Sequence, residues 1–102
     1  MSNVDYIVRA VTEILDPEKI ILFGSSLKKT GEVNDLDVAV VQKGKPKIGQ
    51  KADVMLALER LGYSWKIDPD IHIFSSKDFD KKLVDGDLFT REIAKGKVIY
   101  VQ

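Results

Sequence analysis

Residues 21–41, ILFGSSLKKTGEVNDLDVAVV, hold two apolar runs separated by a polar segment. The first run, Lys19–Phe23, is short, rich in β-branched residues and followed by Gly24, as is typical of a buried strand. The second run, Leu36–Gln42, has the same character. Between them, Ser25–Lys29 predicts a brief helix, and the glycine and asparagine that follow predict a turn. This stretch therefore predicts two neighbouring core strands.

Helical and strand patterns alternate outward from this stretch. The expected elements are a helix that ends near Leu15 before Pro17, a helix over Ile48–Leu61 that ends at Gly62, a strand over Asp70–Phe74, helical turns over Lys77–Val84 and Asp87–Lys95, and a last strand over Lys97–Val101. This order predicts an α/β (α+β) fold in which a small mixed β-sheet is packed with helices.

Composition narrows the function before any motif is considered. The 102 residues are 44% hydrophobic, which is enough for one core, and the 16 basic and 16 acidic side chains balance. A formal charge of zero argues against non-specific nucleic-acid binding. With no cysteine and a single histidine, His72, any metal must be held by oxygen. Without a long apolar run or a signal-peptide pattern, we expect a soluble, cytoplasmic protein.

Three aspartates are expected to converge at one end of the sheet. The second and third strands are joined by a helical connection long enough for a parallel crossover, so their starting ends lie side by side. Asp35 and Asp37 begin the second strand, one strand period apart, and Asp70 begins the third. Clustered carboxylates repel one another unless a cation is shared, and an all-oxygen set suits Mg²⁺ or Mn²⁺ completed by substrate phosphates.

The first strand adds a second element to this end. If it runs antiparallel to the second strand, Gly24 and Ser25 reach the same edge and form a plausible phosphate cradle. Simpler interpretations exist for each element. A Gly-Ser pair after a strand is commonly an ordinary turn, and Asp-Leu-Asp at a strand start is commonly a solvated edge or a cap. Only their predicted convergence favours a functional site.

The run ILFGSSLKKTGEVNDLDVAVV resembles the signature of the minimal nucleotidyltransferases, the MNT family of the DNA polymerase β-type nucleotidyltransferase superfamily. The signature is Gly-Ser, a spacer, and Asp-x-Asp opening an apolar strand. Residues 87–101, DLFTREIAKGKVIYV, look like the closing helix and strand of these proteins, so the resemblance covers essentially the whole chain. It implies a polymerase β-like nucleotidyltransferase fold and a single nucleotidyltransferase domain over residues 1–102.

The resemblance also implies site roles. Gly24 and Ser25 would hold the nucleoside triphosphate, Asp35 and Asp37 would bind two Mg²⁺ or Mn²⁺ ions, and a third carboxylate would join the metals and help to activate the attacking hydroxyl. Asp70 matches that third place, and Asp68 competes for it. The implied reaction transfers a nucleoside monophosphate, AMP from ATP, to an acceptor hydroxyl and releases pyrophosphate.

The resemblance further implies a partner. Stand-alone domains of this type are often paired, as antitoxin to toxin, with a small helical protein of the HEPN type, and some modify a tyrosine of that partner with AMP. In this chain the spacer between Ser25 and Asp35 has nine residues where ten are more common, and the arginine common after Gly-Ser is absent. These departures favour the alternative of a non-catalytic, antitoxin-like binding module that neutralises its partner by covering it.

Several other residues carry weaker predictions. Lys43, Lys45, Lys47 and Lys51 form a basic segment that is most simply solvated, with contact to phosphates or an acidic partner as the alternative. His72 shares the strand face of Asp70 and is expected to be an ordinary sheet-face residue, with a place in the site as the alternative. The aromatic and aliphatic residues at helical spacing near the C-terminus, Phe79, Leu83 and Phe89, are expected in the core.

Overall fold

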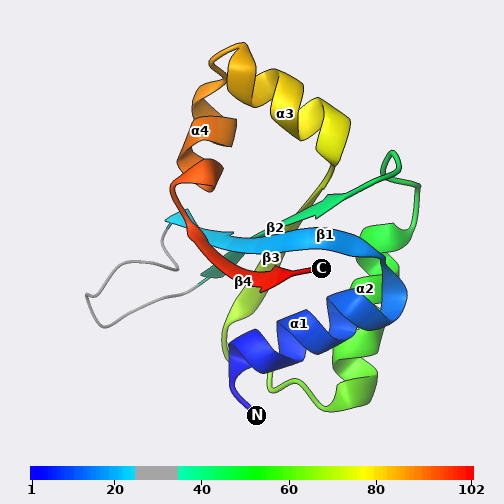
Figure 1. Cartoon of the computed structure of the whole chain (residues 1–102). Helices are drawn as coiled ribbons and strands as arrows, with labels where there is room; N and C mark the ends of the chain where they lie inside the picture. The colour runs from blue at the N-terminus through cyan, green and yellow to red at the C-terminus, as the bar shows by residue number, and fades with distance from the viewer. Residues whose placement is uncertain (25–34) are drawn as a thin grey trace.

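The computed structural model describes residues 1–24 and 35–102, and within these ranges four helices pack on the two faces of a four-stranded sheet (Figure 1). The helices α1 and α2 lie against one face, and α3 and α4 lie on the other. The elements in chain order are α1 (Asn3–Ile14), β1 (Pro17–Phe23), β2 (Asp35–Gln42), α2 (Gln50–Leu61), β3 (Asp68–Ser75), α3 (Ser76–Val84), α4 (Leu88–Ala94) and β4 (Lys97–Val101). The helix expected over Ser25–Lys29 and the turn after it lie outside the described residues.

The strand order is β3-β2-β1-β4, and the sheet is mixed. β2 pairs with β3 in parallel, and β1 pairs antiparallel with both β2 and β4. The parallel pair is the one whose connection contains α2, since parallel neighbours need a long crossover. The predicted parallel pairing of the second and third strands is confirmed, and the antiparallel pairing of the first two, on which the phosphate-cradle hypothesis depended, is present.

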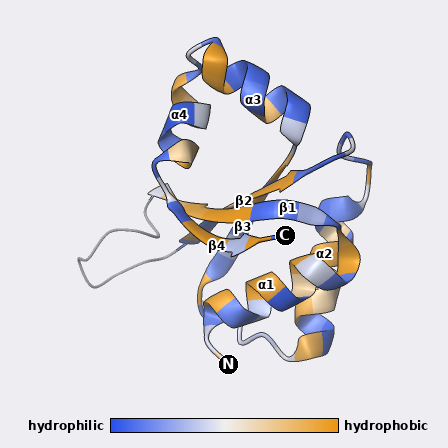
Figure 2. Cartoon of the chain, viewed as in Figure 1, coloured by the Kyte–Doolittle hydropathy of each residue, from blue (hydrophilic) through white to orange (hydrophobic). Residues whose placement is uncertain are grey.

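Both faces of the two central strands are buried, which explains their nearly continuous apolar sequences. Figure 2 shows hydrophobic ribbon along β2 and the later part of β1, between the two helical layers, whereas the start of β1 is hydrophilic. Toward α1 and α2, the buried side chains include Ile7, Val11, Ile20, Val38, Val40 and Leu58. Toward α3 and α4, they are Ile21, Phe23, Ala39, Val41, Phe79 and Ile93. Successive residues of β2 therefore alternate between two cores.

Capping residues and prolines explain where several helices and strands begin and end. Ser2 caps α1, where its hydroxyl accepts from the Asp5 N–H and the Asp5 carboxylate accepts from the Ser2 N–H. Gly62 ends α2 in the left-handed conformation, as expected. β1 and β3 each begin earlier than predicted, and each includes a proline that the prediction placed outside the strand. Pro17 lies at a register irregularity of β1, and Pro69 lies in an edge strand. Both are places where a missing N–H is tolerated.

Among the helices of the described ranges, none is long and apolar enough to cross a membrane.

Gly96, between α4 and β4, provides a test of this packing. A Cβ there would lie 2.2 Å from the Leu22 carbonyl oxygen and 2.8 Å from Ile21 Cγ2. We expect Gly96→Ala to destabilise the protein by about 1–3 kcal/mol, as overpacking does, and to lower Tm by roughly 4–8 °C per kcal/mol. At Gly44 a Cβ meets nothing within 4 Å, so Gly44→Ala is the matched control. Equal melting temperatures for the two variants would contradict the packing of β4 against β1.

Candidate active site

The registers of three strands bring the predicted residues to one end of the sheet. Asp37 of β2 is paired with Phe23 of β1 on one side and with Asp70 of β3 on the other. Gly24 directly follows Phe23, so Gly24, Asp37 and Asp70 meet at this end. Asp35, the first residue of β2, is exposed and is paired with Asp68. Ser25 lies outside the described residues.

Gly24 and Asp37 approach each other closely. Gly24 has φ +63°, and a Cβ built on it would lie 2.7 Å from Asp37 Oδ2. Glycine is needed there for two independent reasons, the left-handed backbone and the nearby carboxylate. The sequence predicted that these residues share an edge, and the structure adds that the carboxylate of one lies against the backbone of the other.

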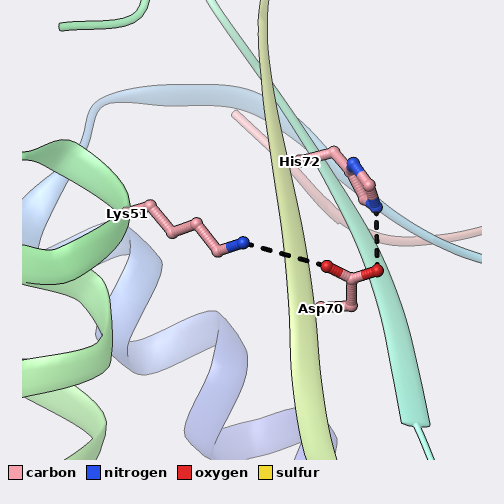
Figure 3. A network of polar contacts seen from close by, with 3 residues as sticks. All are labelled: Lys51, Asp70 and His72. Atoms are coloured by element: carbon pink, nitrogen blue, oxygen red, sulfur yellow. Dashed lines mark hydrogen bonds and ion pairs between the residues drawn. The ribbon is translucent and has the colours of Figure 1, made fainter. Parts of the chain in front are cut away.

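The Asp70 carboxylate has a contact at each oxygen (Figure 3). Lys51 Nζ, which reaches over from α2, lies 3.9 Å from Oδ1, and His72 Nε2 lies 3.2 Å from Oδ2. The side chains of Lys51 and Asp70 are 56% and 49% exposed, so their ion pair contributes at most about 1 kcal/mol. This ion pair therefore contributes little to the stability of the fold.

The sequence left Asp68 and Asp70 as competitors, and their surroundings differ. Asp70 is the register partner of Asp37. The negative charge of Asp68 acts on Tyr63, whose pKa is raised chiefly by burial and further by that charge. Tyr63 belongs to the core under α1 and α2. Asp70 is therefore the carboxylate beside Asp37.

His72 is the neighbour that the sequence left open. It is half-buried, contacts Asp70, and packs its ring 5.7 Å from that of Phe23 and 5.4 Å from that of Phe89. Its spacing of two residues from Asp70 on a strand is the signal that placed both on one face.

The expectation that Phe89 is a core residue is wrong. Phe79 is buried, as expected, and Leu83 is half-buried, but Phe89 is 45% exposed. The buried positions of α4 are Thr90 and Ile93, three residues apart, so Phe89 lies beside the core stripe. The helical spacing counted from Phe79 does not apply to Phe89, because a turn separates α3 from α4 and each helix has its own buried face.

Three of the four lysines lie away from the carboxylates. Lys43, Lys45 and Lys47 follow the far end of β2 and line a pocket of about 240 Å³ with Gln42 and Gln50. β2 has eight residues, so its two ends are about 23 Å apart at ~3.3 Å per residue. Only Lys51 reaches the aspartate end, and the interpretation of a shared phosphate-binding role for all four is not supported.

The donors at the aspartate end are carboxylate oxygens, which suit hard cations such as Mg²⁺ or Mn²⁺. Within residues 1–24 and 35–102, no three histidine, cysteine, aspartate or glutamate side chains form a group that could hold a metal ion. The neighbouring pair Asp37 and Asp70 nevertheless fits the usual way in which Mg²⁺ binds, through one or two carboxylates with substrate phosphates as further ligands.

A comparison with family models identifies the chain. Residues 7–102 match the model described as polymerase beta, nucleotidyltransferase. The chain belongs to this nucleotidyltransferase family. The predicted polymerase β-like nucleotidyltransferase fold and superfamily are thereby confirmed.

The solved structures give the same fold. This nucleotidyltransferase is similar to a chain in the crystal structure of a mutant of the toxin–antitoxin MntA-HpeT, with a TM-score of 0.64, 14% identity, and coverage of 99% of this chain and 75% of that one. At this identity the likeness concerns the fold. No curated protein matches the sequence.

The close approach of Gly24 and Asp37 generates a testable prediction. In Gly24→Ala, the added Cβ should displace the Asp37 carboxylate, so the Asp37 ¹³Cγ resonance should shift. Gly49 also has a positive φ, +94°, but a Cβ there meets nothing within 4 Å. Gly49→Ala therefore carries similar backbone strain, of about 1–2 kcal/mol, and should leave the Asp37 resonance in place. An unmoved resonance in both variants would show that the two groups do not touch.

Proposed function

We propose that this chain is a metal-dependent nucleotidyltransferase that transfers a nucleoside monophosphate, AMP from ATP, to an acceptor hydroxyl on a partner protein and releases pyrophosphate. The observation that carries the proposal is the strand register, in which Asp37 stands between the end of β1 at Gly24 and Asp70 of β3. Family membership supports the reaction class. The proposal assigns the nucleotide, the metal, the acceptor and the site residues.

The proposed binding roles follow the chemistry of each group. Asp35, Asp37 and Asp70 would hold two Mg²⁺ or Mn²⁺ ions, in keeping with the general use of divalent metals in this family. When bound, such ions lower the pKa of an attacking hydroxyl and offset charge on the leaving oxygens. The Gly24 N–H and the Ser25 hydroxyl would position the outer phosphates by hydrogen bonds.

The proposed reaction is an in-line displacement. The acceptor oxygen forms a bond to the α-phosphorus, the bond from that phosphorus to the bridging oxygen of the β-phosphate breaks, and pyrophosphate leaves. Asp70 receives the acceptor proton. Contacts from Lys51 and His72 to its two oxygens support this role because they bias the direction of the carboxylate while leaving it accessible.

A protein acceptor is proposed by analogy with the similar solved structure, which is a toxin–antitoxin. The similar solved structure is that of a toxin–antitoxin carrying a double mutation, in which two aspartates, two positions apart, are changed to glutamate. The same spacing separates Asp35 from Asp37. We propose that the partner of this chain is likewise a toxin, a small helical protein of the HEPN type, and that the chain acts as its antitoxin.

The test combines binding and transfer. Mg²⁺ with ATP is titrated into the protein by calorimetry, and transfer from α-labelled ATP to the protein encoded by the adjacent gene is followed by mass. Asp37→Asn should reduce transfer by about 10³-fold or more, the effect of losing several kcal/mol of transition-state stabilisation, without changing Tm by more than a few degrees. Asp80→Asn, at an exposed aspartate of α3, is the control and should transfer normally.

Two results would count against the enzyme. Undiminished transfer by Asp37→Asn would remove the carboxylates from the mechanism. A stable complex with the partner that forms without nucleotide and without any mass change, together with no binding of ATP at millimolar concentration, would establish the non-catalytic binding module instead.

A further inference from the structure

Three aromatic rings meet on the α3 and α4 face of the sheet. The ring of Phe89 lies 5.5 Å from that of Phe23 at 79° and 5.4 Å from that of His72 at 71°, and the rings of Phe23 and His72 are 5.7 Å apart. The two contacts of Phe89 are edge-to-face, whereas the Phe23 and His72 rings are tilted at 56°. An edge-to-face aromatic pair contributes about 0.5–1.5 kcal/mol beyond burial. Phe23 is buried, whereas Phe89 is 45% exposed. Phe89 is thus an exposed ring that two neighbours hold in one orientation.

This cluster stands directly behind the carboxylates. Phe23 is the register partner of Asp37 and precedes Gly24, and His72 contacts Asp70. His72 is also the register partner of Ala39, whose small side chain lies next along the same face of β2 after Asp37. Phe89, which touches both Phe23 and His72, therefore bridges the Gly24 side and the Asp70 side of the site.

We propose that Phe89 is the surface on which the nucleobase of the incoming nucleotide stacks, an inference that rests on the proposed function. A nucleotide whose α-phosphate lies between Asp37 and Asp70 must place its base within the length of one ribose from them. Phe89 lies on the Asp70 side of the site with only the His72 ring between them: its ring is 5.4 Å from that of His72, whose Nε2 is 3.2 Å from Asp70 Oδ2.

The chemical groups of the aromatic cluster determine which nucleobases it favours. The rings of Phe23 and Phe89 have no hydrogen-bonding groups, and Nε2 of His72 is engaged with Asp70. Among the described residues, this aromatic surface recognises a base by its π-face, so larger bases stack on it more strongly. The surface therefore favours purine over pyrimidine nucleotides.

The experiment separates the base from the phosphates. Calorimetry with Mg²⁺ compares ATP, GTP and CTP with inorganic tripolyphosphate, which offers the phosphate chain without a base. Phe89→Ala should weaken the affinity for ATP and GTP by about 5- to 150-fold, the range expected for the loss of base–aromatic stacking. The same variant should change the affinity for tripolyphosphate by less than about twofold. Phe89→Trp should retain ATP affinity. Leu88→Ala, at an 80% exposed apolar neighbour on α4, is the matched control and should bind like the unmodified chain.

Other outcomes overturn the inference in distinguishable ways. Equal losses of affinity for ATP and tripolyphosphate in Phe89→Ala would show that Phe89 supports the position of the carboxylates and does not contact the base. Normal ATP binding with impaired transfer would assign the ring to the acceptor protein. If the unmodified chain binds tripolyphosphate as tightly as ATP, no base surface exists, although the proposed function survives. If it binds neither compound at millimolar concentration with Mg²⁺, the proposed function fails as well.

Discussion

The placement of β2 between an antiparallel and a parallel neighbour is the constraint on which the site depends. Val38 and Val40 of this strand are fully buried in the core under α1 and α2, and Ala39 and Val41 fill the opposite core. Side chains alternate along a strand, so a slip of one residue would exchange the two sets. The same slip would carry Asp37 toward the α1 and α2 core and would break its pairings with Phe23 and Asp70. The apolar packing of the whole domain therefore fixes the positions of two carboxylates.

The change from polar to apolar residues along β2 also explains why a site lies at this end. Asp35 is exposed, Asp37 is half-buried, and every residue from Val38 to Gln42 is buried. Carboxylates are tolerated only where the helical layers stop covering the sheet, since a buried, unpaired charge costs several kcal/mol. The far end of β2 has a different character: Gln42 donates to the Gly44 carbonyl and to Gln50, which shapes the lysine-lined loop.

Much of this arrangement could be predicted from local sequence. Strand and helix order, the parallel pairing of β2 with β3, and the convergence of Asp37 with Asp70 follow from apolar runs, connection length and strand period. The place of Gly24 beside them was conditional on β1 running antiparallel to β2, which the register shows. The prediction of Asp35 and Asp37 on one face needs only alternation. What sequence could not supply were contacts that depend on how a helix is docked against the sheet. The exposure of Phe89 depends on the turn that separates α3 from α4, because that turn determines which stripe of a seven-residue helix faces Ile21 and Phe23. Periodicity identifies the face of an element but not the rotation of one element against another.

The contacts of Asp70 show how an acidic site remains compatible with folding. Neighbouring carboxylates repel each other, and the Lys51 ammonium group at 3.9 Å offsets part of that repulsion. At this distance two unit charges interact by only about 1 kcal/mol in water, so the pair forms readily and is also readily broken. A stronger or buried partner would stabilise the carboxylate but would compete with any cation or proton that must reach it. The weak, half-exposed ion pair reduces the repulsion between carboxylates while leaving Asp70 accessible, as the proposed role of Asp70 requires.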